Sequence, residues 1–252
     1  MAFSQTRDTA RAKLEIGKLA RTVLLGGFAI VVMGYGVMAF QYFFAFFAGE
    51  REWWNLFQAQ MVSDEFSFGD GSVFKEQHEF YSFNKFLLFG HTTLGGICLA
   101  IGWSQFVSRF RKSAPQIHRT VGKVYLATAL LSMTLGLLHL STVPLRGVFS
   151  GPAFGIGLWG LDFLVITTAV LAYTAIRNKD VRAHQGWMAF NYALICATPL
   201  LRVFWLTFGS TTDLTQSQIN SGISTVLLPL CLIVGMVWYS TEYMRDRRSH
   251  SS

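Results

Sequence analysis

Long apolar stretches separated by short charged segments dominate the pattern along the chain. Almost no charge occurs in residues 22–48, 86–108, 124–145, 154–176, 187–208 and 221–241. Each stretch exceeds the ~20 residues that an α-helix needs to cross the ~30 Å hydrocarbon core of a bilayer. Backbone polar groups in lipid must be satisfied within the segment, so each stretch is expected to be a helix. The sequence therefore predicts an all-α fold, a polytopic membrane bundle of six transmembrane helices.

The positions of the lysines and arginines predict the orientation of this bundle. Cytoplasmic loops carry an excess of these residues, and most of them fall on one side if both termini are cytoplasmic. The outer side then keeps only Arg51, Lys75, Lys85 and Arg146. The net charge of +7 follows from this topology and from contact with lipid phosphates, so it indicates no nucleic-acid partner. We expect a multi-pass protein of the bacterial inner (cytoplasmic) membrane.

These boundaries divide the chain into six parts. They are a cytoplasmic basic N-terminal segment (1–21), the first transmembrane helix (22–48), an acidic aromatic outer loop (49–85), a four-helix core of two related hairpins (86–208), an outer loop with the last transmembrane helix (209–241), and a basic tail (242–252).

The outer loop carries two candidate features. Trp53, Trp54 and Phe57 have helical spacing and predict an interfacial helix on the outer leaflet, where aromatic side chains are favoured. The same loop is the expected surface for a membrane-protein partner. Its acidic part is expected to be a solvated loop, and the alternative is a divalent-cation site with Glu76, His78 and Glu79 as ligands.

Two short basic linkers each end in a histidine that opens an apolar helix. They read RKSAPQIH, ending at His118, and RNKDVRAH, ending at His184, with the same offset from arginine to histidine. The two predicted hairpins therefore have the same arrangement of a basic linker, a histidine and an apolar helix. The positive end of a helix dipole favours neutral imidazole, which is the form that binds a metal.

Depth along the predicted helices sorts the histidines into two pairs. His118 and His184 are expected at the cytoplasmic interface, and His91 and His139 near the outer one. Each of His91, His118 and His139 has a glycine one turn away that leaves room for a flat cofactor: Gly95, Gly122 and Gly136. Basic side chains near the cytoplasmic edge could pair with the propionates of such a cofactor: Arg119, Lys123 and Arg182.

This arrangement predicts a b-type haem held by two imidazoles from different helices. His118 and His184 are the candidate ligands of the iron, with His91 and His139 as the other pair. His118 and His139 are separated by about 31 Å along one helix, which favours one haem over a transmembrane pair. A near-surface quinone or lipid site remains open. The same glycines and basic residues also have an explanation without a cofactor. Glycine allows close helix packing, and the basic residues follow from the membrane topology.

Two charges lie inside otherwise apolar spans. Asp162 and Arg202 are each about 10–12 Å from the outer end of their helices by the helical rise. We expect them to form an ion pair, because pairing relieves two large desolvation costs. The pair would lock two helices together or act as a proton or substrate relay.

The stretch from His91 to Arg202 resembles a bacterial family of predicted integral membrane proteins classed as a domain of unknown function. The matching features are His91 with Gly95, the Gly102–Phe106 stretch, His118-Arg119-x2-Gly122-x2-Tyr125, His184-x2-Trp187-Met188, and Arg202. Gln185, Ala189 and Phe190 stand where the family usually places arginines, which argues against an anion site there. The resemblance implies a multi-helix inner-membrane protein and implies no reaction.

Three functional hypotheses follow from the sequence. We favour an accessory or structural subunit of a membrane complex, and keep a haem-binding electron-transfer protein as the alternative; enzymatic activity is undecided. A transporter ranks third, because the sequence shows no pair of Gly/Pro-broken helices of the kind that forms many transport sites. Hydrolysis is not expected, since no nucleophile–base set or metalloprotease motif occurs.

Overall fold

The computed structural model describes residue 23, residues 26–40 and residues 53–250. Within this part of the chain every regular element is a helix. The basic segment 1–21 and both ends of the first predicted span lie outside the described residues. The all-α prediction is confirmed for the described residues.

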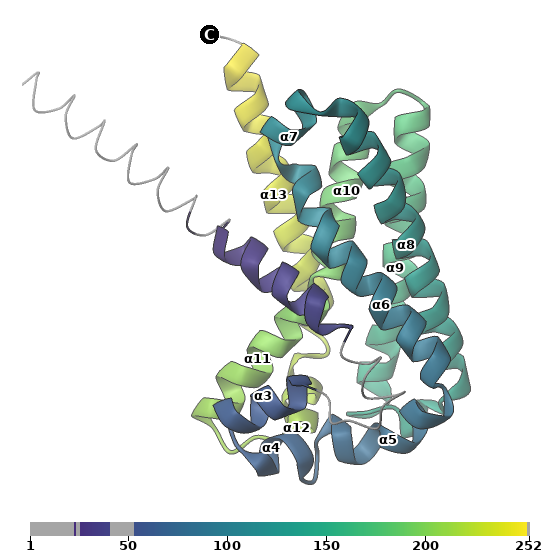
Figure 1. Ribbon diagram of the computed structural model, residues 1–252, viewed down its shortest axis with the longest axis vertical. Coiled ribbons are helices and arrows are strands. Elements are labelled where there is room, and N and C mark those ends of the chain that lie inside the picture. Colours follow the sequence, from purple (N-terminus) through teal and green to yellow (C-terminus); the bar gives the residue numbers. More distant parts are fainter. Residues whose placement is uncertain (1–22, 24–25, 41–52, 251–252) are drawn as a thin grey trace, which may run out of the picture.

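The long helices run side by side along the bundle (Figure 1). They are α6 (Lys85–Gly102), α8 (Pro115–Thr142), α9 (Pro152–Arg177), α10 (Val181–Ile195) and α13 (Leu227–His250). α6 packs on α8, α8 on α9, α9 on α10, and α10 on α13. The short helices η1 (Trp103–Phe106) and α7 (Ser108–Ser113) join α6 to α8, and η2 (Leu145–Gly147) leads from α8 towards α9.

Four helical segments of the described chain are long and apolar enough to cross a membrane. They cover 85–106, 115–142, 152–177 and 181–211, and a fifth span arises if α12 (Gln216–Ile223) and α13 are counted as one bent helix. The segment 181–211 joins α10 to α11 (Ala197–Thr211). Of the first predicted span, the structure describes a shorter apolar helix, Gly26–Met38. The described part of the chain thus contains four or five candidate spans, and six spans with cytoplasmic termini stay a prediction.

The described part of the first helix crosses α6 at a pair of glycines. A Cβ added to Gly36 would lie 2.7 Å from the carbonyl oxygen of Gly96, and one added to Gly96 would lie 2.6 Å from that of Gly36. Small residues allow this close backbone approach between membrane helices.

Short helices cover one end of the bundle (Figure 1). We call α3 (Trp53–Met61), α4 (Asp64–Phe68), α5 (Val73–Phe83) and α12 the cap. The predicted outer loop 49–85 is therefore largely helical where it is described. α3 has the amphipathic character expected of an interfacial helix, with Trp53 45% exposed and Trp54 7% exposed.

Hydrogen bonds to backbone groups hold α12 against the rest of the cap. The side chain of Gln216 accepts from the Val73 N–H (3.0 Å) and donates to the Phe66 carbonyl (2.9 Å). The Ser217 N–H donates to the carbonyl of Gly71 at 2.9 Å. Gly71 has φ +76° and a Cβ there would lie 2.6 Å from the Thr215 hydroxyl, so this contact requires glycine.

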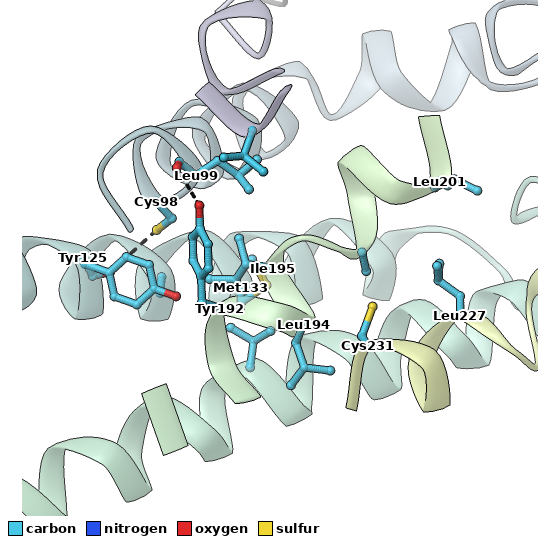
Figure 2. Packing of buried hydrophobic residues seen from close by; sticks show 14 of the residues in the cluster. Cys98, Leu99, Tyr125, Met133, Tyr192, Leu194, Ile195, Leu201, Leu227 and Cys231 are labelled. Carbon is cyan, nitrogen blue, oxygen red and sulfur yellow. Dashed lines mark hydrogen bonds between the residues drawn. The ribbon is translucent and has the colours of Figure 1, made fainter. Parts of the chain in front are cut away.

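Two tyrosines, Tyr125 and Tyr192, pack against α6 in the centre of the bundle (Figure 2). The Tyr192 hydroxyl donates to the Leu99 carbonyl at 3.1 Å, and the Cys98 thiol lies 3.6 Å from the Tyr125 carbonyl. Gly102 makes room for both rings, since a Cβ there would collide with Tyr192 and lie 2.8 Å from Tyr125. Gly102 and Tyr125, two residues of the sequence motifs, thus pack directly together.

Candidate functional site

A cavity of about 240 Å³ lies where the cap meets the bundle. Its walls are largely apolar and include Leu88, Leu99, Met133, Phe149, Leu194 and Leu201. Besides Tyr35 and Tyr81, four ionisable side chains from four helices line it: His91 of α6, His139 of α8, Asp162 of α9 and Arg202 of α11. The structure therefore gathers the predicted outer histidines and the two intramembrane charges around one space.

Gly136 on α8 brings His91 and Asp162 close to each other. A Cβ at Gly136 would lie 2.7 Å from Asp162 Oδ2 and 2.8 Å from His91 Nδ1. His91 Nδ1 donates to the Ser132 carbonyl at 2.9 Å, while the Ser132 hydroxyl donates to the His91 carbonyl at 2.7 Å. A neutral His91 in this arrangement keeps its acceptor lone pair on Nε2. The ring is thus held in one orientation at the cavity.

Two further polar groups at the cavity have no hydrogen-bond partner among the residues that the structure describes. They are His139 Nδ1 and Asn220 Nδ2. The His139 ring lies 5.9 Å from that of Tyr81, and the Asn220 side-chain oxygen accepts from the Trp205 indole N–H at 2.6 Å. Buried polar atoms usually have partners, so these two indicate a place for a bound molecule or water.

The guanidinium of Arg202 is stacked on an aromatic side chain. Its Cζ lies 3.9 Å from the centre of the Trp205 ring and 6.0 Å from that of Trp54. Cation–π contacts of this kind stabilise a partly desolvated cation. Arg202 and Asp162 face the same cavity, but the ion pairs of the described residues do not include a direct one between them. Their energetic coupling stays a prediction.

The other two histidines lie at the opposite end of the bundle, where α8 and α10 begin. His118 and His184 are near enough to interact electrostatically. His184 Nδ1 donates to the Ala172 carbonyl at 2.9 Å, and His118 Nδ1 is buried without a hydrogen-bond partner among the described residues. Arg119 is exposed beside them. The structure thus brings this pair together, with His184 held in one orientation.

The predicted cation site in the outer loop has no described geometry. The side chains of His78 and Glu79 lie outside the described ones. Among the residues with described side chains, no group of three or more histidine, cysteine or carboxylate residues is placed to hold a metal ion.

The sequence interpretation missed a row of polar residues between the two histidine pairs. Tyr125 and Ser132 follow His118 at steps of seven residues, and His139 is the next step. Seven residues make nearly two helical turns, so all four share one face of α8. Asn191 follows His184 at the same step. This spacing was the signal in the sequence that identifies the polar face.

Asn191 connects three helices at the centre of this row. Its side-chain oxygen accepts from the Tyr125 hydroxyl at 2.7 Å. Its amide nitrogen donates to the Val165 carbonyl and to the Thr168 hydroxyl, both at 2.8 Å. Tyr125 and Asn191 are both 0% exposed, so their polar atoms are satisfied entirely within the protein.

Comparison with known proteins identifies a family for this fold. A family model described as "Predicted membrane protein (DUF2306)" matches residues 88–239. The match contains the four ionisable residues of the cavity as well as His118 and His184. No curated protein and no solved structure matches the chain.

Proposed function

Because the chain belongs to the DUF2306 family of predicted membrane proteins, we propose that it is a ligand-binding protein of a bacterial inner membrane. In the proposed orientation six spans cross the membrane, both termini are cytoplasmic and the cap is outside. One observation carries the proposal: four ionisable side chains from separate helices converge on a single, largely apolar cavity. Ionisable residues at membrane depth are costly and mark sites of function.

The size and lining of the cavity define the class of ligand. Its volume of about 240 Å³ is somewhat larger than the ~150 Å³ apolar cavity that accommodates benzene. The Arg202 guanidinium stacks with one face on the Trp205 ring. Its N–H donors point outward in the plane of the group, in the geometry that binds an oxyanion. The ligand is a compact organic monoanion with one apolar ring or a body of similar size.

Benzenesulfonate tests this proposal, with neutral benzenesulfonamide as its matched isostere. We expect isothermal titration calorimetry of the purified protein to detect the binding of benzenesulfonate. Arg202→Gln should weaken this binding about tenfold or more, because a charge-assisted hydrogen bond is lost. Arg146→Gln removes an exposed arginine outside the cavity and should leave the affinity unchanged. Equal binding of sulfonate and sulfonamide, or no binding of either, would exclude an anion site at Arg202.

A b-type haem is the second candidate function, and the orientation of His184 favours it. Histidines that ligate a metal commonly donate their other ring N–H to a backbone carbonyl, as His184 does to Ala172. His118 and His184 would hold the iron, and exposed Arg119 lies nearby for a propionate. The haem would supply one-electron transfer. His91 and His139 fit it less well, because their cavity of about 240 Å³ suits a compact ligand and is too small for a porphyrin.

An absorption difference spectrum tests the haem proposal. Protein purified from haem-replete cells is expected to give a sharp b-type band on dithionite reduction, and His118→Ala or His184→Ala should remove it because an axial ligand is lost. His91→Ala is the matched control and should keep the band. A colourless wild-type preparation that remains folded would exclude this candidate.

The accessory-subunit hypothesis is compatible with ligand binding. α3 exposes an apolar face formed by Trp53, Leu56, Phe57 and Met61. In the proposed orientation this face lies against the outer leaflet, as amphipathic aromatic helices do. A protein partner remains a proposal that rests on the position of the cap alone.

A further inference from the structure

Two interrupted helices meet at the cavity. α10 ends at Ile195 and α11 begins at Ala197, and α12 and α13 are bent by 59° across their short connection. Pro199 in the first turn of α11 has no N–H to donate to the carbonyl of Ile195, which lines the cavity. Arg202 follows the first interruption and Asn220 comes just before the second, and both side chains line the same cavity. The sequence-based argument against a transporter cited a lack of broken helix pairs, and the described residues contain one bent pair, α12 with α13.

The row of polar residues continues from the cavity through the bundle. Ser132 lies beside His91 at the cavity end, and Tyr125 and Asn191 form the hydrogen-bonded centre. Beyond them, Gln105 Oε1 lies 3.3 Å from the position of a Cβ on Gly122, one turn from His118. Ser132, Tyr125, Asn191 and Gln105 are all buried. Polar and ionisable residues inside a membrane protein mark paths for ions, protons or substrates.

Asp162 is the group at the cavity best placed to exchange a proton. It is buried, and neither a hydrogen bond nor an ion pair joins it to another described residue. The titratable or charged groups that share its cavity are Tyr35, Tyr81, His91, His139 and Arg202. Carboxyl groups inside membrane proteins form the proton relays of pumps and transporters.

We propose that the protein is a carrier that moves a compact organic monoanion together with one proton across the membrane. This inference rests on the proposed binding function. The anion enters the cavity from the cap side and binds Arg202, and a proton from the outer water forms an O–H bond with the Asp162 carboxylate. After the helix interruption at Cys196 and the bend between α12 and α13 change conformation, both leave on the other side. The Asp162 O–H bond breaks there and its proton passes to water, so one negative and one positive charge move together.

Proteoliposomes that contain the full-length protein test the carrier with labelled benzenesulfonate. This anion stays ionised, so it does not cross lipid as a neutral acid. We expect uptake above that of protein-free liposomes, faster uptake when the outside is more acidic, and acidification of the interior, read with a trapped pH dye. Asp162→Asn should still bind benzenesulfonate in a titration, but its coupled proton entry should fall about tenfold or more.

Asp213→Asn removes an exposed carboxylate outside the cavity and should behave as wild type. Binding without uptake, or uptake without acidification, would overturn the carrier and leave the binding function in place. The absence of both binding and uptake would overturn the two proposals together. An Asp162→Asn variant with unchanged proton entry would refute the role of this carboxyl group.

Discussion

Gly136→Ala should lower the affinity for benzenesulfonate about tenfold or more and destabilise the fold by about 1–3 kcal/mol, the usual cost of overpacking a core. The added methyl group would lie 2.7 Å from Asp162 Oδ2 and 2.8 Å from His91 Nδ1, closer than real Cβ contacts. His91 is held by Ser132, so the Asp162 carboxyl group must move, and the cavity is the space it faces. Titration and thermal unfolding of the purified variant measure the two effects.

Gly160→Ala on α9 is the matched control for this substitution. A Cβ at Gly160 would be 3.6 Å from the nearest atom, a methyl carbon of Leu228, which is an ordinary contact. This variant should keep the wild-type affinity and lose no stability, because alanine also has the higher helix propensity. If Gly136→Ala bound benzenesulfonate as tightly as Gly160→Ala, the positions of Asp162 and His91 beside Gly136 would have no part in ligand binding.

Hydropathy predicted the long helices because lipid contact constrains composition over a whole span. The predicted stretch 154–176 and α9 (Pro152–Arg177) nearly coincide. The predicted stretch 124–145 misses the start of α8 at Pro115, since the first turns carry polar side chains and are helical all the same. Hydropathy locates the uncharged part of a helix, whereas the start of the helix is set by its backbone hydrogen bonds.

The interruptions of the helices were harder to predict. The apolar stretch 187–208 has no break in hydropathy, although the helix ends at Ile195 and starts again at Ala197. Pro199 is the local signal, but a proline in the first turn of a helix is also common without any bend. The outer loop predicted at the start of 209–241 contains α12, which depends on contacts of Gln216 with Phe66 and Val73 far away in the sequence.

The residues of the cavity could be predicted individually but their arrangement could not. A charge in an apolar span is conspicuous, which is why Asp162 and Arg202 were recognised. Their predicted direct contact depends on side-chain directions, and Arg202 is stacked on Trp205. Uncharged polar residues such as Tyr125 and Asn191 lower hydropathy only slightly, so their common face becomes evident from the seven-residue spacing and from the packing of α8 against α9 and α10.

The hydrogen bond between Tyr125 and Asn191 leads to the second large expected effect, which concerns stability. Asn191→Leu removes the acceptor of the Tyr125 hydroxyl and two amide hydrogen bonds. We expect it to cost about 2–4 kcal/mol of unfolding free energy, because the buried groups left behind find no water. Tyr125→Phe removes one donor and should cost about 1 kcal/mol. Reversible unfolding in mixed detergent micelles measures both changes.

The double variant separates this pair from general packing. If Tyr125 and Asn191 are partners, the double change should be less harmful than the sum of the single changes by about 0.5–1.5 kcal/mol. Tyr173→Phe, at a tyrosine that is 51% exposed, is the control and should be additive with Asn191→Leu. Additivity in both cycles would mean that the bond contributes nothing to stability.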